Sequence, residues 1–304
     1  MIGSFQLLPF SGAEAEPILD DLRAQPLLLL RPEPQTSPLI FASPHSGRLY
    51  PEGFVRQTRL DSLTLRKSED AFVDELFGCV GALGAPLLAA RFPRAYIDSN
   101  RAPGEIDAAM FDGPIACWVG PRTPRVAAGL GVIPRIVRDG VDIYDGRLTG
   151  REVLFRFENF YRPYHTALSR LIAQTRDQFG LAIVVDCHSM PPPAKGMEIV
   201  IGDCYGESAA PGVIAQAHAT LTSLGFSVTR NAPYAGGYTT RLYGKPEAGV
   251  HAVQIEVNRA LYLDETTMEK SADFAQAKDR LRRFARALTA RSWTDLTRRQ
   301  AAAE

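Results

Sequence analysis

Residues 181–189, LAIVVDCHS, decide the fold class. The five residues 181–185 form a continuous apolar run, which is typical of a strand buried on both faces. Such a strand belongs to a sheet that helices cover on both sides. The run ends directly in Asp186, Cys187, His188 and Ser189. We therefore expect an α/β protein that carries reactive side chains at the end of a central strand.

Short apolar runs alternate with longer helical patterns along the rest of the chain. Strands are expected at 38–43, 85–91, 95–98, 181–186, 197–201 and 250–257. Helices are expected at 69–83, 152–179, 212–224 and 266–291. Pro163 predicts that the second of these helices begins late or kinks. The segments 102–150 and 231–249 are rich in Gly and Pro, as binding or lid elements often are.

The domain organisation follows from the absence of any dividing segment in the sequence. Repeats, low-complexity stretches and Gly/Ser linkers do not occur in the 304 residues. One α/β domain is therefore predicted for 1–304, with a core at roughly 38–264 and a C-terminal helix at roughly 266–291.

Composition and charge exclude several classes of partner. The chain has 34 basic and 34 acidic residues, so no overall field attracts nucleic acid or anionic lipid. The apolar run 26–30 is too short to span a bilayer, and the N-terminus lacks the basic region of a secretory signal. The four cysteines form no CxxC pair, which favours free thiols in a reducing compartment. We expect a cytoplasmic protein; its oligomeric state is not predicted.

Four predicted strands end in polar residues, at 43–47, 98–101, 186–189 and 254–259. Ligands of open α/β sheets bind at the carboxyl ends of the strands, so these segments are expected to share one rim. His45 and His188 stand at two of the strand ends, and imidazole is the usual nitrogen ligand of zinc. The sequence thus predicts a cation site. The other histidines, His165, His218 and His251, have ordinary helix or strand positions and are interpreted as structural.

A third metal ligand should be a carboxylate. Glu69, Asp70 and Asp74 are candidates at the start of a predicted helix, where acidic side chains also stabilise the helix dipole. Asp186 shares the strand face of His188 and is the alternative partner, orienting that imidazole rather than binding the cation.

Glu256 is the candidate general base. A carboxylate within the apolar strand 252–257 is costly to bury without a partner or a purpose. It could take a proton from water and return it to a leaving amine; the alternative is an ion pair with Arg259. Arginines lie near the same segments and indicate a pocket for a small anionic substrate: Arg48, Arg94, Arg101, Arg241 and Arg259.

Together these motifs resemble the N-formylglutamate amidohydrolase family over residues 38–264. The resemblance rests on SPHSG at 43–47, RAYIDSNR at 94–101, DCHSMP at 186–191, GGYTTR at 236–241 and QIEVNR at 254–259, with Tyr262 beyond. The family is distantly similar to zinc carboxypeptidases and aspartoacylases. This similarity implies a zinc-carboxypeptidase-like fold, in which helices flank a mixed, mostly parallel sheet.

The resemblance also implies roles for individual residues. Asn100 and Arg101 would bind a substrate carboxylate, Glu256 would be the base, and one zinc would be bound. Carboxypeptidase-like enzymes have a glutamate ligand three positions after the first histidine, where this chain has Arg48. Asp70 is therefore our choice for the third ligand, with Glu69 and Asp74 left open. Arg94 and Arg241 would contact the oxyanion or a second carboxylate.

The implied activity is hydrolysis of N-formyl-L-glutamate to formate and L-glutamate, a step of histidine degradation. One alternative is a deacylase or carboxypeptidase that acts on another acidic N-acyl compound. Another is a non-catalytic protein that binds acidic amino acids. A nucleophile enzyme using Ser46, Ser189 or Cys187 is a third, although the chain lacks a GxSxG motif.

Overall fold

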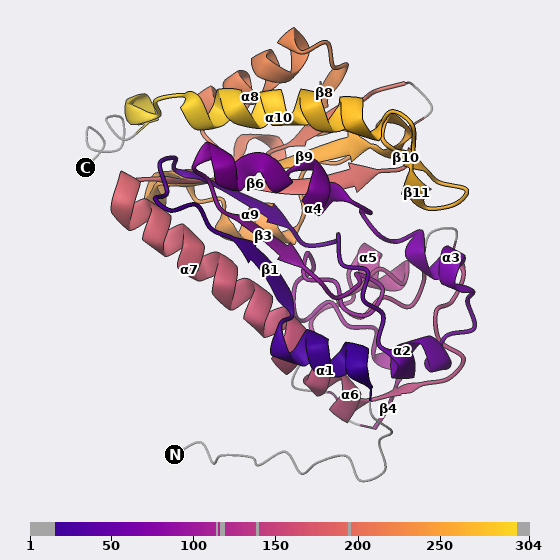
Figure 1. Ribbon diagram of the computed structural model, residues 1–304. Helices are drawn as coiled ribbons and strands as arrows, with labels where there is room; N and C mark the ends of the chain where they lie inside the picture. The colour runs from indigo at the N-terminus through magenta and orange to yellow at the C-terminus, as the bar shows by residue number, and fades with distance from the viewer. Residues whose placement is uncertain (1–15, 114, 116–118, 138–139, 194–195, 297–304) are drawn as a thin grey trace, which may run out of the picture.

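A seven-stranded mixed sheet lies at the centre of the computed structural model (Figure 1). The structure describes residues 16–113, 115, 119–137, 140–193 and 196–296. The strand order is β1-β3-β2-β6-β9-β7-β8. The strands are β1 (Leu27–Leu30), β2 (Leu39–Ser43), β3 (Leu87–Ala90), β6 (Ala182–Met190), β7 (Ile199–Gly202), β8 (Val228–Arg230) and β9 (Val250–Asn258). Within this sheet, as far as the structure describes it, only the pairs β1–β3 and β7–β9 are antiparallel. The predicted α/β class with a mostly parallel sheet is confirmed.

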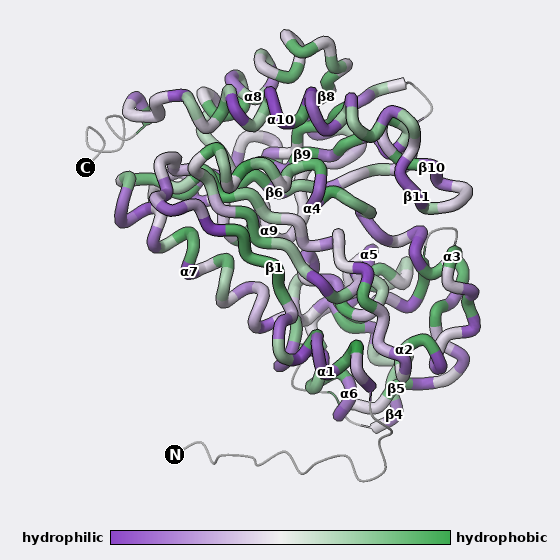
Figure 2. Tube along the Cα trace, viewed as in Figure 1, coloured by the Kyte–Doolittle hydropathy of each residue, from purple (hydrophilic) through white to green (hydrophobic). Residues whose placement is uncertain are grey.

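Helices cover both faces of this sheet (Figure 1). One face packs against α4 (Val73–Leu76), α8 (Pro211–Ser223), α10 (Phe274–Ala290) and a 3-10 helix at Gly78–Leu83. The other packs against α7 (Arg162–Phe179), which follows α6 (Gly150–Arg156) and a π-helical turn at Phe157–Tyr161. Along α7 hydrophobic and hydrophilic residues alternate (Figure 2), as expected for a helix with one buried side.

Besides four further 3-10 helices, at Ala108–Met110, Cys204–Gly206, Pro246–Ala248 and Arg259–Leu261, the remaining α-helices and strands of the described residues are short. They are α1 (Pro17–Ala24), α2 (Glu52–Gln57), α3 (Ser62–Arg66), α5 (Pro124–Ala127), α9 (Tyr238–Tyr243) and the two-stranded pairs β4 (Phe111–Asp112) with β5 (Leu148–Thr149) and β10 (Leu263–Asp264) with β11 (Glu269–Lys270). No helix among the described residues is long and apolar enough to cross a membrane.

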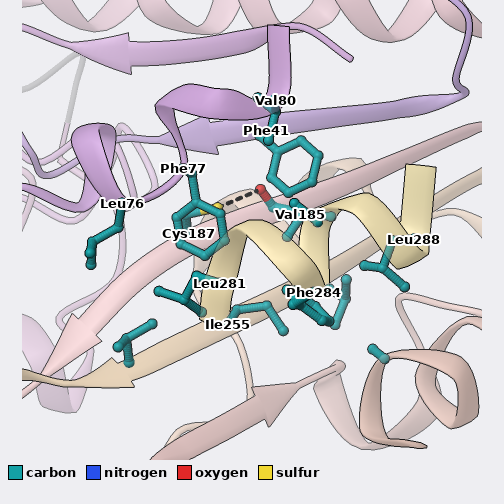
Figure 3. Close-up of a cluster of buried hydrophobic side chains, with 14 of the residues drawn as sticks. Phe41, Leu76, Phe77, Val80, Val185, Cys187, Ile255, Leu281, Phe284 and Leu288 are labelled. Carbon is teal, nitrogen blue, oxygen red and sulfur yellow. Dashed lines mark hydrogen bonds between the residues drawn. The ribbon is translucent and has the colours of Figure 1, made fainter. Parts of the chain in front are cut away.

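The central strand β6 lies between two hydrophobic clusters, and successive side chains of the strand point alternately into one and the other. Ile183, Val185 and Cys187 belong to the cluster beneath α8 and α10, where Figure 3 shows Cys187 beside Phe77. Ala182 and Val184 belong to the cluster beneath α7. Because side chains alternate across a strand, the even-numbered residues share the α7 side. We call this side of β6 and β9 the even face.

Three predicted elements were wrong at their boundaries or in type. The expected strand 95–98 is a turn, in which Tyr96 and Ile97 donate backbone hydrogen bonds to Pro93. Its apolar residues are buried in the α7-side cluster without joining the sheet. The expected helix 69–83 is broken because Phe72 adopts a left-handed backbone (φ 62°) just before α4. The expected helix 266–291 begins only at Phe274, since β11 occupies part of its start.

Other expectations were confirmed or incomplete. The helix 152–179 is present and contains a π-helical turn that ends two residues before Pro163. The segments 102–150 and 231–249 are largely irregular but contain α5 and α9. The edge strands β1 and β8 were missed. Both are short, at 4 and 3 residues, so neither shows a clear alternation.

Candidate metal and active site

The even face turns polar toward the carboxyl ends of β6 and β9. On β6 the apolar even positions are followed by Asp186 and His188, and on β9 by Gln254 and Glu256. The two strands are parallel, and His188 lies directly opposite Glu256 in their register. His45 follows the end of β2, the neighbour of β6 on its other side. Parallel strands thus bring both histidines and the glutamate to one rim, as the sequence predicted.

His45 and His188 converge on one carboxylate, that of Asp70. Its Oδ2 lies 3.3 Å from Nδ1 of His45 and 3.0 Å from Nδ1 of His188. One ligand atom from each of the three residues can be chosen so that all lie within 4.8 Å of one another, and all three residues are buried. Two imidazoles and a carboxylate are the protein ligand set of many catalytic zinc sites. This buried group could bind a metal ion.

The other ring nitrogen of each imidazole, Nε2, faces a further carboxylate, which is a different residue for each histidine. Nε2 of His45 lies 2.8 Å from Oδ1 of Asp98, and Nε2 of His188 lies 3.0 Å from Oδ2 of Asp186. A carboxylate accepts a hydrogen bond, so Nε2 of His45 can donate to Asp98. Both Nδ1 atoms lie within hydrogen-bonding distance of Asp70, and a cation bound between the three residues would take the place of the proton on each Nδ1. Metal-binding histidines commonly have this arrangement, so the residues present fit a divalent cation.

Asp70 is held in the ionised form. Burial opposes its charge, but hydrogen bonds from His188 and His45 keep the pKa of Asp70 well below its ordinary value. Oδ1 also accepts hydrogen bonds from Ser189 and Arg259, each at 3.3 Å. The backbone N–H of Asp70 donates to the carbonyl of His45 at 3.0 Å. The irregular segment before α4, rather than a helix, therefore positions this carboxylate.

The other two carboxylates of that segment have different partners. Glu69 accepts hydrogen bonds from Tyr50 (2.8 Å) and Arg66 (3.2 Å). Asp74 forms an ion pair with Arg48 at 3.4 Å. Among the three candidates, only Asp70 contacts the histidines within the described residues.

Glu256 carries no ion pair with Arg259, which instead contacts Asp70 and the backbone carbonyls of Glu69 and Lys67. Its carboxylate accepts a 2.6 Å hydrogen bond at Oε1 from the amide of Gln254. Burial, opposed in part by His188, raises the pKa of Glu256 to about 7. A carboxyl group that gains and loses a proton near neutral pH is suited to general base catalysis.

Gln254 was missed as a site residue, although its position two residues before Glu256 puts both on one strand face. Its Oε1 accepts a 2.7 Å hydrogen bond from the backbone N–H of Gly237. This contact fixes the orientation of the amide, because a backbone N–H can only donate. The NH₂ group must therefore face Glu256.

The predicted substrate arginines occupy different environments. Arg94 donates through Nε to Asp98 at 2.9 Å, and its side chain is 25 % exposed. Arg101 is buried and donates to the carbonyls of Asn100 and Leu130. Arg241 is exposed on α9. Their predicted contacts with substrate stay predictions.

Asn100 lies inside the site with both ends of its amide engaged. Its Oδ1 accepts a hydrogen bond from the backbone N–H of Thr239 (2.7 Å), and its Nδ2 lies 3.1 Å from Nε2 of His188. This arrangement favours a part in orienting His188; its predicted role in binding substrate is not tested. Asp98 was named in the motif but not assigned a role, since only the fold shows that it faces His45.

The predicted thiols lie away from this group. Cys79, Cys187 and Cys204 are free, whereas Cys117 lies outside the described residues. The side chain of Cys187 is on the opposite side of β6 from His188. It is therefore badly placed as a nucleophile beside the histidines.

Comparisons with known proteins agree on one family. A family model described as N-formylglutamate amidohydrolase matches residues 37–263. N-formylglutamate deformylase of Pseudomonas aeruginosa is 30% identical over 254 residues, covering 79% of this chain and 88% of the relative. The enzyme of the same name from Pseudomonas putida is 29% identical over 244 residues, covering 75% and 83%.

Solved structures show a similar fold. The N-formylglutamate amidohydrolase of Ralstonia eutropha JMP134 superposes with a TM-score of 0.83 at 34% identity, covering 90% of this chain and 99% of that one. A gene product of Agrobacterium tumefaciens gives a TM-score of 0.63 at 21% identity, covering 89% and 97%. The second similarity concerns the fold alone.

Proposed function

This chain belongs to the N-formylglutamate amidohydrolase family, and we propose that it is a metal-dependent hydrolase of N-formyl-L-glutamate. The products would be formate and L-glutamate. The observation that carries the proposal is the convergence of His45, Asp70 and His188 next to Glu256 on one rim. The names of the relatives supply the substrate.

The proposed metal ligands are Nδ1 of His45, Nδ1 of His188 and the carboxylate of Asp70, with zinc as the first candidate. A divalent cation bound there would polarise the formyl carbonyl and lower the pKa of water at the site. The three residues would also set where the amide lies relative to Glu256, because His188 and Glu256 are register neighbours.

Glu256 would take the proton from the attacking water and return it to the amine that leaves. Gln254 donates to Oε1, which leaves Oε2 as the oxygen that carries the proton. Proton return matters because glutamate must depart as an amine rather than as an amide anion. A pKa near 7 allows the same group to serve as base and then as acid.

Arginines would bind the charged parts of the substrate. Arg94 uses Nε for Asp98, so its two terminal nitrogens are candidates for contact with the developing oxyanion. The Asn100-Arg101 pair and Arg241 are the candidates for the two substrate carboxylates. A small dianion would thus be preferred over a neutral amide.

The first test measures cation content together with hydrolysis of N-formylglutamate before and after chelation. We expect about one divalent cation per chain, loss of activity with the chelator and recovery with zinc. His188→Ala should abolish both cation binding and hydrolysis. His218→Ala, at an exposed position on α8, should change neither cation content nor activity. Full activity in a cation-free protein would contradict the mechanism.

A second test separates the substrate classes. We expect formyl hydrolysis to exceed hydrolysis of the acetyl and peptidyl derivatives of glutamate; the reverse order would indicate the alternative deacylase or carboxypeptidase. Glu256→Gln should abolish turnover but leave substrate binding, with exposed Glu247→Gln as the matched control. A non-catalytic binding protein would tolerate both substitutions.

A further inference from the structure

Two side chains from the helical layer reach the loop that carries Asp98. The hydroxyl of Tyr161, the last residue of the π-helical turn, donates to the carbonyl of Arg101 at 2.8 Å. Nε2 of His165, four residues later in α7, lies 2.9 Å from the carbonyl of Ser99. The two contacts to one loop thus come from the end of the π-helical turn and from the residue two positions after Pro163. Turns of this kind often mark functional positions in helices.

The two carbonyls flank Asn100, so the contacts fix the backbone on both sides of this residue. The side chain of Asn100 lies against Nε2 of His188. Its backbone N–H donates to Oδ1 of Asp98, the same oxygen that accepts from His45. A shift of this loop would therefore move the partners of both candidate metal-binding imidazoles.

His165 is held in one protonation state and one orientation. A carbonyl can only accept, so Nε2 carries the proton and Nδ1 accepts from the hydroxyl of Tyr243 at 2.9 Å. The ring of Tyr161 packs on the imidazole, with centroids 4.4 Å apart. Burial lowers the pKa of His165 to about 4, so the ring is neutral at physiological pH.

We propose that Tyr161 and His165 are positioning residues that hold the loop 98–101 so that Asp98 and Asn100 orient the two imidazoles of the candidate metal site. The inference extends the role of His165 beyond the structural one expected from its sequence position. It deepens the proposed function and rests on the metal site proposed there. Neither residue needs to touch cation or substrate.

Tyr161→Phe tests the hydroxyl contact, and Tyr164→Phe is its matched control. Tyr164 is a fully buried tyrosine of the same helix, and its hydroxyl has no hydrogen-bond partner among the described residues. Affinity for Zn²⁺ is measured by chelator competition, and the visible spectrum of the Co²⁺-loaded protein reports ligand geometry. We expect Tyr161→Phe to weaken Zn²⁺ binding about two- to tenfold, the effect of one net hydrogen bond. Tyr164→Phe should leave affinity and spectrum unchanged.

Two substitutions of His165 distinguish the contribution of its Nε2 contact from that of its Nδ1 contact. Gln can place its amide NH₂ near the position of Nε2 and keep the contact with Ser99, whereas Asn reaches only as far as Nδ1. We expect His165→Gln to retain Zn²⁺ affinity within about twofold and His165→Asn to lose about as much as Tyr161→Phe. A generally destabilised helix would affect both alike. Thermal unfolding of the cation-free proteins measures that destabilisation. If a His165 variant does not fold, the comparison of Tyr161→Phe with Tyr164→Phe still tests the inference.

The outcomes distinguish this inference from the proposed function. Equal Zn²⁺ affinity and equal Co²⁺ spectra for Tyr161→Phe and Tyr164→Phe would overturn the inference alone. A wild-type protein that binds the cation but does not hydrolyse N-formylglutamate would overturn the proposed substrate, while the comparison of variants would still decide the inference. A wild-type protein that binds no cation would overturn both.

Discussion

Replacing Gln254 with Met should shift the pH dependence of hydrolysis to higher pH. Met has a similar length but no donor, so the 2.6 Å hydrogen bond to Oε1 of Glu256 is lost. A hydrogen bond to a charged group contributes about 1.5–3 kcal/mol. It favours the carboxylate over the protonated form, so its loss raises the pKa of Glu256. At about 1.4 kcal/mol per pKa unit, the rise is roughly one to two units.

The size of the effect on rate follows from the ionised fraction. With a pKa of about 7, about half of Glu256 is ionised at pH 7, and the variant would retain roughly 1–10%. We therefore expect kcat/KM at pH 7 to fall by about five- to fiftyfold and to recover near pH 9–10. A bound cation would lower the pKa in both proteins, so the shift between them is the quantity to compare.

The assay follows amine release from N-formylglutamate between about pH 5.5 and 10 at saturating zinc and constant ionic strength. Both substrate carboxyl groups are ionised above about pH 5, so only the protein titrates in this range. Gln254→Glu is the matched variant: it keeps an acceptor for the N–H of Gly237 but places a second acid beside Glu256. Gln254→Glu should also shift the acidic limb of the pH profile of kcat/KM to higher pH. An acidic limb that stays in place or moves to lower pH in both variants would refute the assignment of Glu256 as the base.

Further predictions concern the cation and the fold. Asp98→Asn should weaken Zn²⁺ binding about 10- to 100-fold, measured by chelator competition, because a neutral amide oxygen attracts and orients the imidazole of His45 more weakly than a carboxylate does; unchanged affinity would contradict that role. A Cβ at Gly47 would overlap the backbone carbonyl of Phe92, so Gly47→Ala should cost about 1–3 kcal/mol in denaturant unfolding, and wild-type stability would show that the loop can relax. Phe284→Ala, in the cluster of Figure 3, should cost about 3–5 kcal/mol without changing Zn²⁺ affinity.

Local pattern was sufficient for the central strands and for the placement of their polar residues. The alternation of side chains is a property of extended backbone, so an apolar run that ends in Asp186 and His188 already puts both on one face. The same rule applies to Gln254 and Glu256. The rim at the carboxyl ends follows because parallel strands end on the same side of a sheet. The motifs around these strand ends also identified the family.

Local pattern misled where the chain turns. Residues 69–83 carry helical spacing, yet the left-handed backbone of Phe72 breaks the helix and frees Asp70 to face the histidines. The residues 95–97 are apolar because they are buried beneath α7, not because they form a strand. Both segments pack against distant residues, Phe72 against Phe274 and Tyr96 against Phe160, and a local window of sequence does not contain those residues.

The sequence by itself determined the α/β class and the placement of the two histidines and Glu256 at or near strand ends, because each depends on residues within one strand or its end. Tertiary structure alone decided which carboxylate joins the histidines and what holds it there. Asp70 lies 25 positions from His45 and 118 from His188, and Asp98 lies 53 from His45. The contacts of Tyr161 with Arg101 and of His165 with Ser99 span 60 and 66 positions of the chain. Such contacts arise only when packing of the helices on the sheet brings these segments together, since strand and helix periodicity specify directions within one element and not the distance to another.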